Sequence, residues 1–245
     1  DWLIKWPGAL PPYKTLSDSA AGIGANVITP DVDGIVRRMP LIVALSDQLY
    51  PTVPMEALLI ATGQQSYQVK MSSAGIEKVR ITNQPIISTD EYARVWLRQN
   101  KNFTRYEITE LQKKRINLKG KIVVVGMAIK SSDNLVMTPN GPVWAHDIQA
   151  QTIQTLLDGN SPVRSAFARS GELLVIVLIA FLLIFVLPRL PSWAFWTSLI
   201  GTLVIVVGGS FYAWQQWNQL WDIYSLIICA IILYGHGLFT RIPAK

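Results

Sequence analysis

Two aspartates and two arginines lie close together in the stretch PDVDGIVRRMPL, just before an apolar run. Asp31 and Asp33 can accept hydrogen bonds from backbone N–H groups, and Gly34 frees the backbone to turn. Arg37 and Arg38 each carry a planar fork of donors that suits a carboxylate or another oxyanion. One interpretation is an internal ion pair, in which one of the arginines binds one of the aspartates and fixes the turn. The other is an anion-binding turn that presents the arginines to a ligand.

A second stretch, LKGKIVVVGMAIKSSDN, predicts a buried strand with a turn at each end, at Gly120 and at Gly126. A phosphate-binding loop has its glycines and its lysine after the strand, where they open a helix. Here Gly120 and Lys121 precede the strand. The stretch therefore predicts a core strand and no nucleotide site.

The loop after this strand, SSDNLVMTPNG, is where we expect binding residues. Open α/β sheets bind ligands beyond the carboxyl ends of their strands, and loops on a rigid sheet often carry binding residues. Asp133 and Thr138 are the polar groups of this loop best suited to face such a crevice. The alternative is that Asp133 only caps the turn.

Groups that support catalysis are scarce in the sequence. It has two histidines, His146 and His236, and lacks a G-x-S-x-G nucleophile elbow. An extracytoplasmic hydrolase has only His146 in its favour, and a single histidine near a helix start is more typical of a surface or capping residue. No cluster of His, Asp and Glu has the spacing of metal ligands. We therefore predict no catalytic residue, no metal and no cofactor.

Hydrophobic residues make up 50% of the 245 residues and are concentrated in the C-terminal part. Three apolar runs, at about 171–188, 193–213 and 222–239, each approach the ~20 residues that span a bilayer as a helix. The sequence therefore predicts an extracytoplasmic domain at 1–165 and a bundle of three transmembrane helices at 171–245, in contact with membrane lipids.

Basic residues in the connections predict the orientation. Arg189 lies in the first connection, and Arg241 and Lys245 lie in the tail, whereas the second connection, QQWNQLWD, has no Lys or Arg. Because basic connections tend to stay inside, the first connection and the tail are expected in the cytoplasm. Arg164 and Arg169, just before the first run, favour the opposite orientation. The majority places the soluble domain in the periplasm or on the extracellular side of a multi-pass inner-membrane protein.

The remaining composition excludes some partners. The net charge is +6, and the densest basic cluster, Lys113-Lys114-Arg115, has no aromatic residues among its members to stack bases, so nucleic-acid binding is not expected. The only cysteine, Cys229, lies in the last apolar run, which excludes disulfides within the soluble domain.

Periodicity in the soluble domain predicts a mixed α/β fold. Strands that alternate with helices favour a sheet covered by helices on at least one face. Helices are expected at 17–25, 53–63 and 146–159, with a helical turn at 107–114, and strands at 41–45, 67–71, 79–82, 92–97 and 121–126. The last helix has one apolar face, formed by Ile148, Thr152, Ile153, Leu156 and Leu157.

The order and spacing of these segments resemble the type-2 CHASE domain (CHASE2), an extracellular sensory region of bacterial receptors. The resemblance covers about residues 6–240, and three membrane helices typically follow the domain. The most specific motif is D-x-D-G-x-x-R-R-x-P-L, which is met by Asp31, Asp33, Gly34, Arg37, Arg38, Pro40 and Leu41. A second motif, G-K-I-V-x-x-G followed by Asp and Thr-Pro, is met by Gly120, Lys121, Gly126, Asp133, Thr138 and Pro139.

The chain also departs from the family pattern. Gln149 stands where the family usually has a histidine in its final helix, and His146 comes three positions earlier. A small Gly-containing turn is usual after the central strand, where this chain has Ile129-Lys130-Ser131-Ser132. The family pattern begins before Asp1, with a membrane helix and a first α/β portion, so the visible chain is expected to be an incomplete domain.

The resemblance implies a receptor input region that relays a signal through membrane helices to a cytoplasmic output. The expected partners are a small ligand or an extracytoplasmic protein, and further copies in a homo-oligomer or a larger membrane complex. The alternative hypothesis is an accessory or structural subunit that kept the scaffold and lost signalling. The altered turn and Gln149 favour the accessory subunit, whereas the intact Asp–Arg motif favours the sensor.

Overall fold

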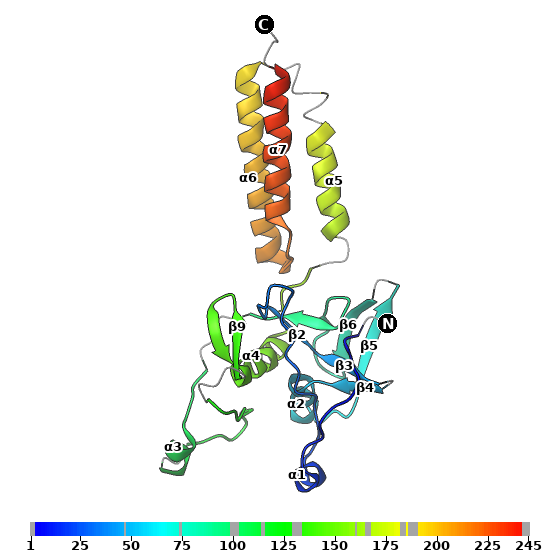
Figure 1. The fold of residues 1–245 in the computed structure, drawn as a ribbon, viewed down its shortest axis with the longest axis vertical. Coiled ribbons are helices and arrows are strands. Elements are labelled where there is room, and N and C mark those ends of the chain that lie inside the picture. The colour runs from blue at the N-terminus through cyan, green and yellow to red at the C-terminus, as the bar shows by residue number, and fades with distance from the viewer. Residues whose placement is uncertain are drawn as a thin grey trace. The chain divides into compact units, whose positions relative to one another are not determined.

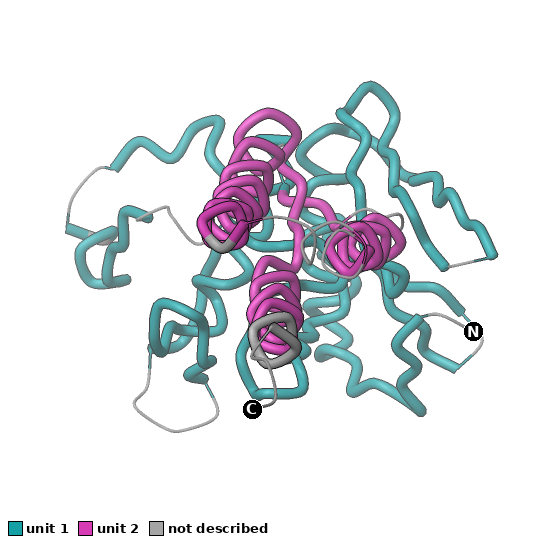
Figure 2. Tube along the Cα trace, turned by 90° about the horizontal axis from the view of Figure 1, so that it is seen from above, with its two compact units in different colours: residues 1–161 teal, residues 162–245 magenta. Residues whose placement is uncertain are grey.

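The computed structural model describes most of the chain. The described residues are 3–46, 48–73, 75–98, 103–113, 116–128, 134–159, 161–164, 168–181, 185 and 191–241. The chain divides into two compact units, Asp1–Ser161 and Pro162–Lys245, which we call unit 1 and unit 2 (Figure 2).

Unit 1 alternates short strands with helices (Figure 1). Its elements are β1 (Lys5–Trp6), α1 (Lys14–Ser19), β2 (Arg38–Pro40), β3 (Ile42–Leu45), β4 (Gln48–Pro51), α2 (Val53–Ala61), β5 (Tyr67–Ser72), β6 (Gly75–Ile81), β7 (Ile87–Ser88), β8 (Arg94–Trp96), α3 (Ile108–Lys113), β9 (Leu135–Thr138), β10 (Gly141–Trp144) and α4 (Ala145–Asp158). The predicted mixed α/β class is confirmed for this unit.

The described strands form four small sheets rather than one large one. Their orders are β1-β3-β4, β2-β8, β5-β6-β7 and β10-β9, and only the β1–β3 pair is parallel. The β2–β8 pair sets Arg38 opposite Trp96 and Pro40 opposite Arg94. This register brings the segment that begins at Asp31 next to the segment around Asp90 and Arg94, although the two are far apart in sequence.

Two apolar clusters hold unit 1 together. In the larger one, α2 buries Met55, Leu58 and Leu59 against the strand residues Val79 and Val95. The smaller one is formed by Val36, Met39, Leu97 and Ile148, and it joins the β2–β8 pair to α4. Buried aliphatic side chains of this kind contribute about 1.5–3 kcal/mol each to stability.

The predicted second and last helices are confirmed. α2 ends at Ala61 and is followed by Gly63, whose φ of +66° lies in the left-handed region, and α4 ends before Gly159 with a φ of +61°. Both glycines therefore end their helices as the sequence predicts. One residue of the predicted face was wrong, because Leu157 is 45% exposed.

The helix predicted at 17–25 was wrong in its position. α1 runs from Lys14 to Ser19, so Ser17 lies within it rather than at its cap. The glycines that follow have another role, since a Cβ on Gly24 would lie 2.7 Å from the backbone N and Cα of Val53. The chain stays non-helical here because it must pass directly over the start of α2.

The strand predicted at 121–126 was also wrong. Residues 121–128 belong to no strand, and Val125 and Met127 are exposed to 79% and 67%. A strand requires a partner for its backbone groups, and no strand of the described residues pairs with this apolar run. The stretch is therefore not a central strand in this structure.

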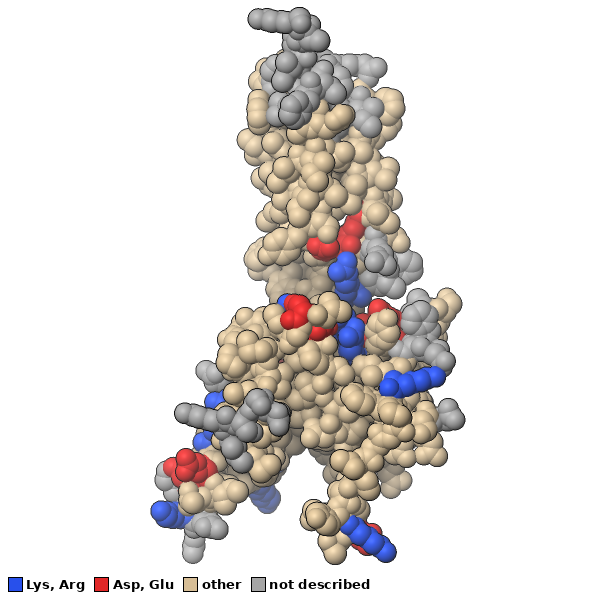
Figure 3. Space-filling view, viewed as in Figure 1, with Lys and Arg blue, Asp and Glu red and all other residues tan. Residues whose placement is uncertain are grey.

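Unit 2 contains three apolar helices, α5 (Ala168–Phe181), α6 (Ser192–Trp217) and α7 (Ile223–Arg241), and α7 packs against the other two. On the face drawn in Figure 3, the described part of the helices is almost free of charged side chains along its length. By length and composition α6 can cross a membrane, whereas the apolar parts of α5 and α7, 170–181 and 223–236, are shorter. The bundle of three transmembrane helices therefore stays a prediction.

Candidate functional site

The Asp–Arg motif begins with a closed turn. The backbone N–H of Asp31 donates to the carbonyl of Ile35 at 3.0 Å, and that of Gly34 donates to the carbonyl of Asp31 at 2.9 Å. Gly34 has a φ of +79°, which favours glycine. Asp33 Oδ1 accepts the N–H of Ile35 at 3.2 Å. The turn is thus fixed by its own backbone and by the side chain of Asp33.

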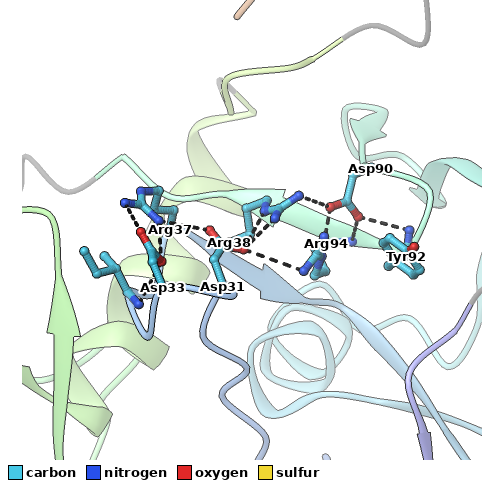
Figure 4. A network of polar contacts seen from close by, with 8 residues as sticks. Asp31, Asp33, Arg37, Arg38, Asp90, Tyr92 and Arg94 are labelled. Atoms are coloured by element: carbon cyan, nitrogen blue, oxygen red, sulfur yellow. Dashed lines mark hydrogen bonds and ion pairs between the residues drawn. The ribbon is translucent and has the colours of Figure 1, made fainter. Parts of the chain in front are cut away.

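Arg37 binds Asp33 with both arms of its guanidinium. Its Nη1 and Nη2 donate to Oδ1 and Oδ2 of Asp33 at 2.9 and 2.7 Å, and Nη1 also lies 3.5 Å from Oδ2 of Asp31 (Figure 4). Two-point contacts of this kind fix orientation as well as charge. The predicted ion pair within the motif is therefore confirmed.

Arg38 connects the turn to a distant segment. Its Nε and Nη2 donate to Oδ1 of Asp31 at 3.0 and 2.5 Å, while Nη1 donates to Oδ2 of Asp90 at 3.0 Å. The guanidinium carbon also lies 5.1 Å from the ring centroid of Trp96, opposite Arg38 in the β2–β8 pair. A cation over an aromatic face adds further attraction.

Asp90 is the second acceptor of this group of charges, and it was not predicted from the sequence. It accepts the backbone N–H groups of Tyr92 and Arg94 at 3.1 and 2.9 Å and the Nε of Arg94 at 2.8 Å. Arg94 in turn lies over the Tyr92 ring at 5.0 Å and 3.7 Å from Asp31. The available signal was the four-residue spacing between Asp90, just before the strand predicted at 92–97, and Arg94 within it, which places two opposite charges at the start of that strand.

The cluster of Asp31, Asp33, Asp90, Arg37, Arg38 and Arg94, which we call the Asp–Arg cluster, has equal numbers of the two charges. Its inner side chains are largely shielded, with 8% exposure for Asp90, 10% for Asp31 and 13% for Arg94, whereas Asp33 is 45% and Arg37 33% exposed. The cluster therefore acts as a brace, in the sense that its buried ion pairs hold the Asp–Arg turn against the segment at Asp90. One end of it, at Asp33 and Arg37, is accessible to solvent.

The accessible pair has shifted ionisation. The two hydrogen bonds from Arg37, helped by the Ile35 N–H, lower the pKa of Asp33 to about 2. The contacts of Arg37 with Asp33, and more weakly with Asp31, raise the pKa of Arg37. A carboxyl group whose folded pKa is depressed stabilises the fold above its unfolded value near 3.8, and this contribution is lost as pH falls towards 2.

We expect the carboxyl carbon of Asp33 to titrate in NMR spectra with a midpoint near 2. Arg37→Met removes the largest cause of the shift, so the midpoint should rise towards 3.8. Lys70→Met, which removes an exposed cation that pairs with Glu77, is the matched control and should leave the Asp33 midpoint unchanged. An Asp33 midpoint that is the same with and without Arg37 would contradict the assignment.

Of the two other predicted binding residues, Thr138 is the last residue of β9, in the β9–β10 hairpin. Thr138 is 5% exposed, donates its hydroxyl to the carbonyl of Gly141 at 2.7 Å and accepts the N–H of Asn140 at 3.3 Å. The hairpin also accepts the N–H of Val36 at the carbonyl of Met137, at 2.8 Å, which ties it to the end of the Asp–Arg turn. Asp133 lies outside the described residues.

The glycines of the second motif have separate structural roles. Gly120 has a φ of +72° in a turn closed by the Lys121 N–H and the Leu118 carbonyl at 3.1 Å. A Cβ on Gly126 would lie 2.3 Å from the ring of His146, so the chain passes directly over that histidine. Neither glycine reaches the Asp–Arg cluster through a hydrogen bond of the described residues.

Helix α4 presents buried polar groups to the rest of unit 1. Asp147 is 4% exposed and binds Arg105 at 3.2 and 2.9 Å. Gln149, 5% exposed, donates its Nε2 to Asn26 Oδ1 at 3.0 Å, and its Oε1 has no hydrogen-bond partner in the described part of the chain. Gln149 thus connects α4 to the segment before the Asp–Arg turn.

The described residues contain no group of three or more His, Cys, Asp or Glu that could hold a metal ion. The Asp–Arg cluster can exchange partners at its accessible end. A bound oxyanion could replace Asp33 as the partner of Arg37, or a bound cation could replace Arg37 as the partner of Asp33.

The chain matches the model of a known protein family. The model of the CHASE2 domain matches residues 5–187, which is most of the chain. No curated protein and no solved structure matches the sequence.

Proposed function

Because the chain belongs to the CHASE2 domain family, a family of extracellular sensory domains of receptors, we propose that it is the extracytoplasmic input region of a bacterial transmembrane receptor. Unit 1 receives the signal, and the helices of unit 2 relay it to a cytoplasmic output. The chain itself is not an enzyme and holds no cofactor in this proposal.

The observation that carries the proposal is the extent of the family match. It begins at Lys5 and ends at residue 187, beyond the described end of α5 at Phe181. The family pattern thus includes the sensory fold and the first apolar helix. A family match that continues into an apolar helix supports an input region that reports across a membrane.

We propose that the protein is a multi-pass protein of the inner membrane, with unit 1 in the periplasm or on the extracellular side. The length of α6 supports at least one crossing. The basic residues at Arg189, Arg241 and Lys245 support a cytoplasmic tail.

Protease added to spheroplasts with intact membranes is expected to digest residues 1–165 and to spare a fragment that contains the apolar helices. A tag placed after Lys245 should become accessible only when the membrane is opened with detergent. A unit 1 that is protected in intact spheroplasts would overturn the orientation.

The proposed contact surface for a ligand or a partner protein is the accessible end of the Asp–Arg cluster with the neighbouring hairpin. Arg37 and Arg38 supply donors, and Thr138 contributes by fixing the hairpin turn, since its hydroxyl already binds Gly141. Asp133 precedes the hairpin in sequence, lies outside the described residues, and is proposed as a hydrogen-bond acceptor for the ligand or partner.

The alternative function is an accessory or structural subunit of a larger membrane complex. The observation that favours it is that each arginine of the Asp–Arg cluster is already paired with an aspartate. Purification of the chain from its native membrane in mild detergent distinguishes the two functions. Stoichiometric recovery with other subunits, unchanged by Arg37→Met, supports the accessory subunit, whereas a kinase or cyclase activity that changes with Arg37→Met supports the receptor.

A further inference from the structure

The residues that lead into α5 are paired with the connection between α6 and α7. The N–H of Val163 donates to the carbonyl of Asn218 at 2.9 Å, and the N–H of Leu220 donates to the carbonyl of Val163 at 2.9 Å. Val163 and Gln219 thereby form a parallel β-bridge. Bonds on both sides of Val163 fix the register of the two segments.

Glu172, in the first turns of α5, adds an ionic contact to this pairing. Arg164 Nη2 donates to its Oε1 and Oε2 at 3.2 and 2.9 Å, and the backbone N–H of Asp222 donates to Oε1 at 2.8 Å. Glu172 is 8% exposed, so one shielded carboxylate holds both the entry segment and the connection.

Asp222 connects this pairing to the first turn of α7. Its Oδ1 accepts the N–H of Ser225 at 3.2 Å and its Oδ2 accepts the Ser225 hydroxyl at 2.6 Å. Asp222 is therefore the N-cap of α7, with its backbone N–H bound to Glu172 and its side chain bound to the first turn of the helix.

The start of α5 is also packed closely on the connection. A Cβ on Gly171 would lie 3.0 and 3.1 Å from two ring atoms of Trp221. The glycine thus allows the helix to approach the indole, and a larger side chain would force the two apart.

We propose that these residues form a coupling joint, defined as Pro162–Arg164, Glu172 and Asn218–Asp222. A displacement of the entry segment then reaches α5 and the start of α7 together, because the backbone pairing and Glu172 link both to it. The relay of a signal through the joint rests on the proposed sensory function, but the mechanical linkage does not.

The linkage is tested by hydrogen exchange on the full chain in lipid nanodiscs. Glu172→Ala is expected to speed the exchange of the Val163, Leu220 and Asp222 amides together, by about tenfold or more, as expected for loss of hydrogen bonds to a charged group. Asp18→Ala, which removes an exposed carboxylate from α1, should leave the three rates unchanged. Faster exchange at Asp222 alone would overturn the joint.

A second measurement keeps the proposal testable if Glu172→Ala does not fold. In a Cys229→Ser chain, the pair Val163→Cys and Gln219→Cys is expected to form a disulfide on oxidation. Val163→Cys with Thr197→Cys is the control, since Thr197 lies about 30 Å along α6 from its end and should not react. A 163–219 pair that does not cross-link would overturn the joint.

The two proposals fail in different ways. If the hydrogen-exchange and cross-linking tests both give the expected result while the native complex shows no output that responds to changes in unit 1, the coupling joint is supported and the sensory function is contradicted. If the output responds but the exchange rates of the Val163, Leu220 and Asp222 amides change independently of one another, the sensory function is supported and the coupling joint is contradicted.

Discussion

Asp90→Ala is expected to lower the free energy of unfolding of unit 1 by roughly 3–5 kcal/mol, the range for removing one partner of a buried ion pair. Asp90 is 8% exposed, and its loss leaves Arg94 with the longer 3.7 Å contact to Asp31 as its remaining ion pair among the described residues. It also leaves the backbone N–H groups of Tyr92 and Arg94 without their acceptor. Urea unfolding of the full chain in detergent, followed by pulse proteolysis of unit 1, measures the change.

Two other aspartates are the controls. Asp18→Ala, on the exposed helix α1, should change the stability by less than about 0.5 kcal/mol. Asp33→Ala should have an effect far smaller than that of Asp90→Ala, because water screens the half-exposed Asp33 pair. If Asp90→Ala and Asp18→Ala unfold at the same urea concentration, the Asp–Arg cluster does not brace the fold.

The sequence predicted the local half of this cluster and missed the distant half. Asp33 and Arg37 are four residues apart, so their pairing follows from a single turn. The bond from Arg38 to Asp90 spans 52 residues and depends on the antiparallel register of β2 and β8. That register is set when the two strands pair, so the sequence of either segment alone does not predict it.

The helices and strands that were predicted correctly depend on local signals, and the strands predicted at 41–45, 67–71, 79–82 and 92–97 overlap β3, β5, β6 and β8. The ends of α2 and α4 are set by Gly63 and Gly159, whose positive φ values are local properties. The apolar run at 121–126 had the composition of a buried strand, but composition does not supply the neighbouring strand that its backbone needs. Its failure also removes the strand end from which the ligand-facing loop was argued.

The β9–β10 hairpin was missed although its signal was present. The residues Pro139 and Asn140, followed by Gly141 with a φ of +106°, form a short turn between two apolar segments. Turn residues of this type between such segments predict a hairpin. The loop was instead interpreted as a ligand-facing loop, because it follows the strand predicted at 121–126.

Gly24→Ala is expected to destabilise unit 1 by about 3 kcal/mol, at the upper end of the usual cost of overpacking. The new Cβ would lie 2.7 Å from the backbone N and Cα of Val53 and 2.9 Å from the carbonyl carbon of Thr52, and backbone atoms cannot rotate away. Relief requires the segment to move from α2, which breaks the 3.0 Å bond from the Val53 N–H to the Ala25 carbonyl. Thr52, fully buried at the start of α2, would also be disturbed.

Gly8→Ala is the matched control for this prediction, because no atom lies within 4 Å of the position its Cβ would take. The same methyl group there should leave the stability unchanged or raise it slightly, since alanine restricts the unfolded chain. Both variants are compared by urea unfolding of the full chain in detergent. Equal stabilities of the two variants would mean that the start of α2 can shift to accept the new methyl group. Gly24 would then not be required for the close contact between α2 and the segment that leads into the Asp–Arg cluster.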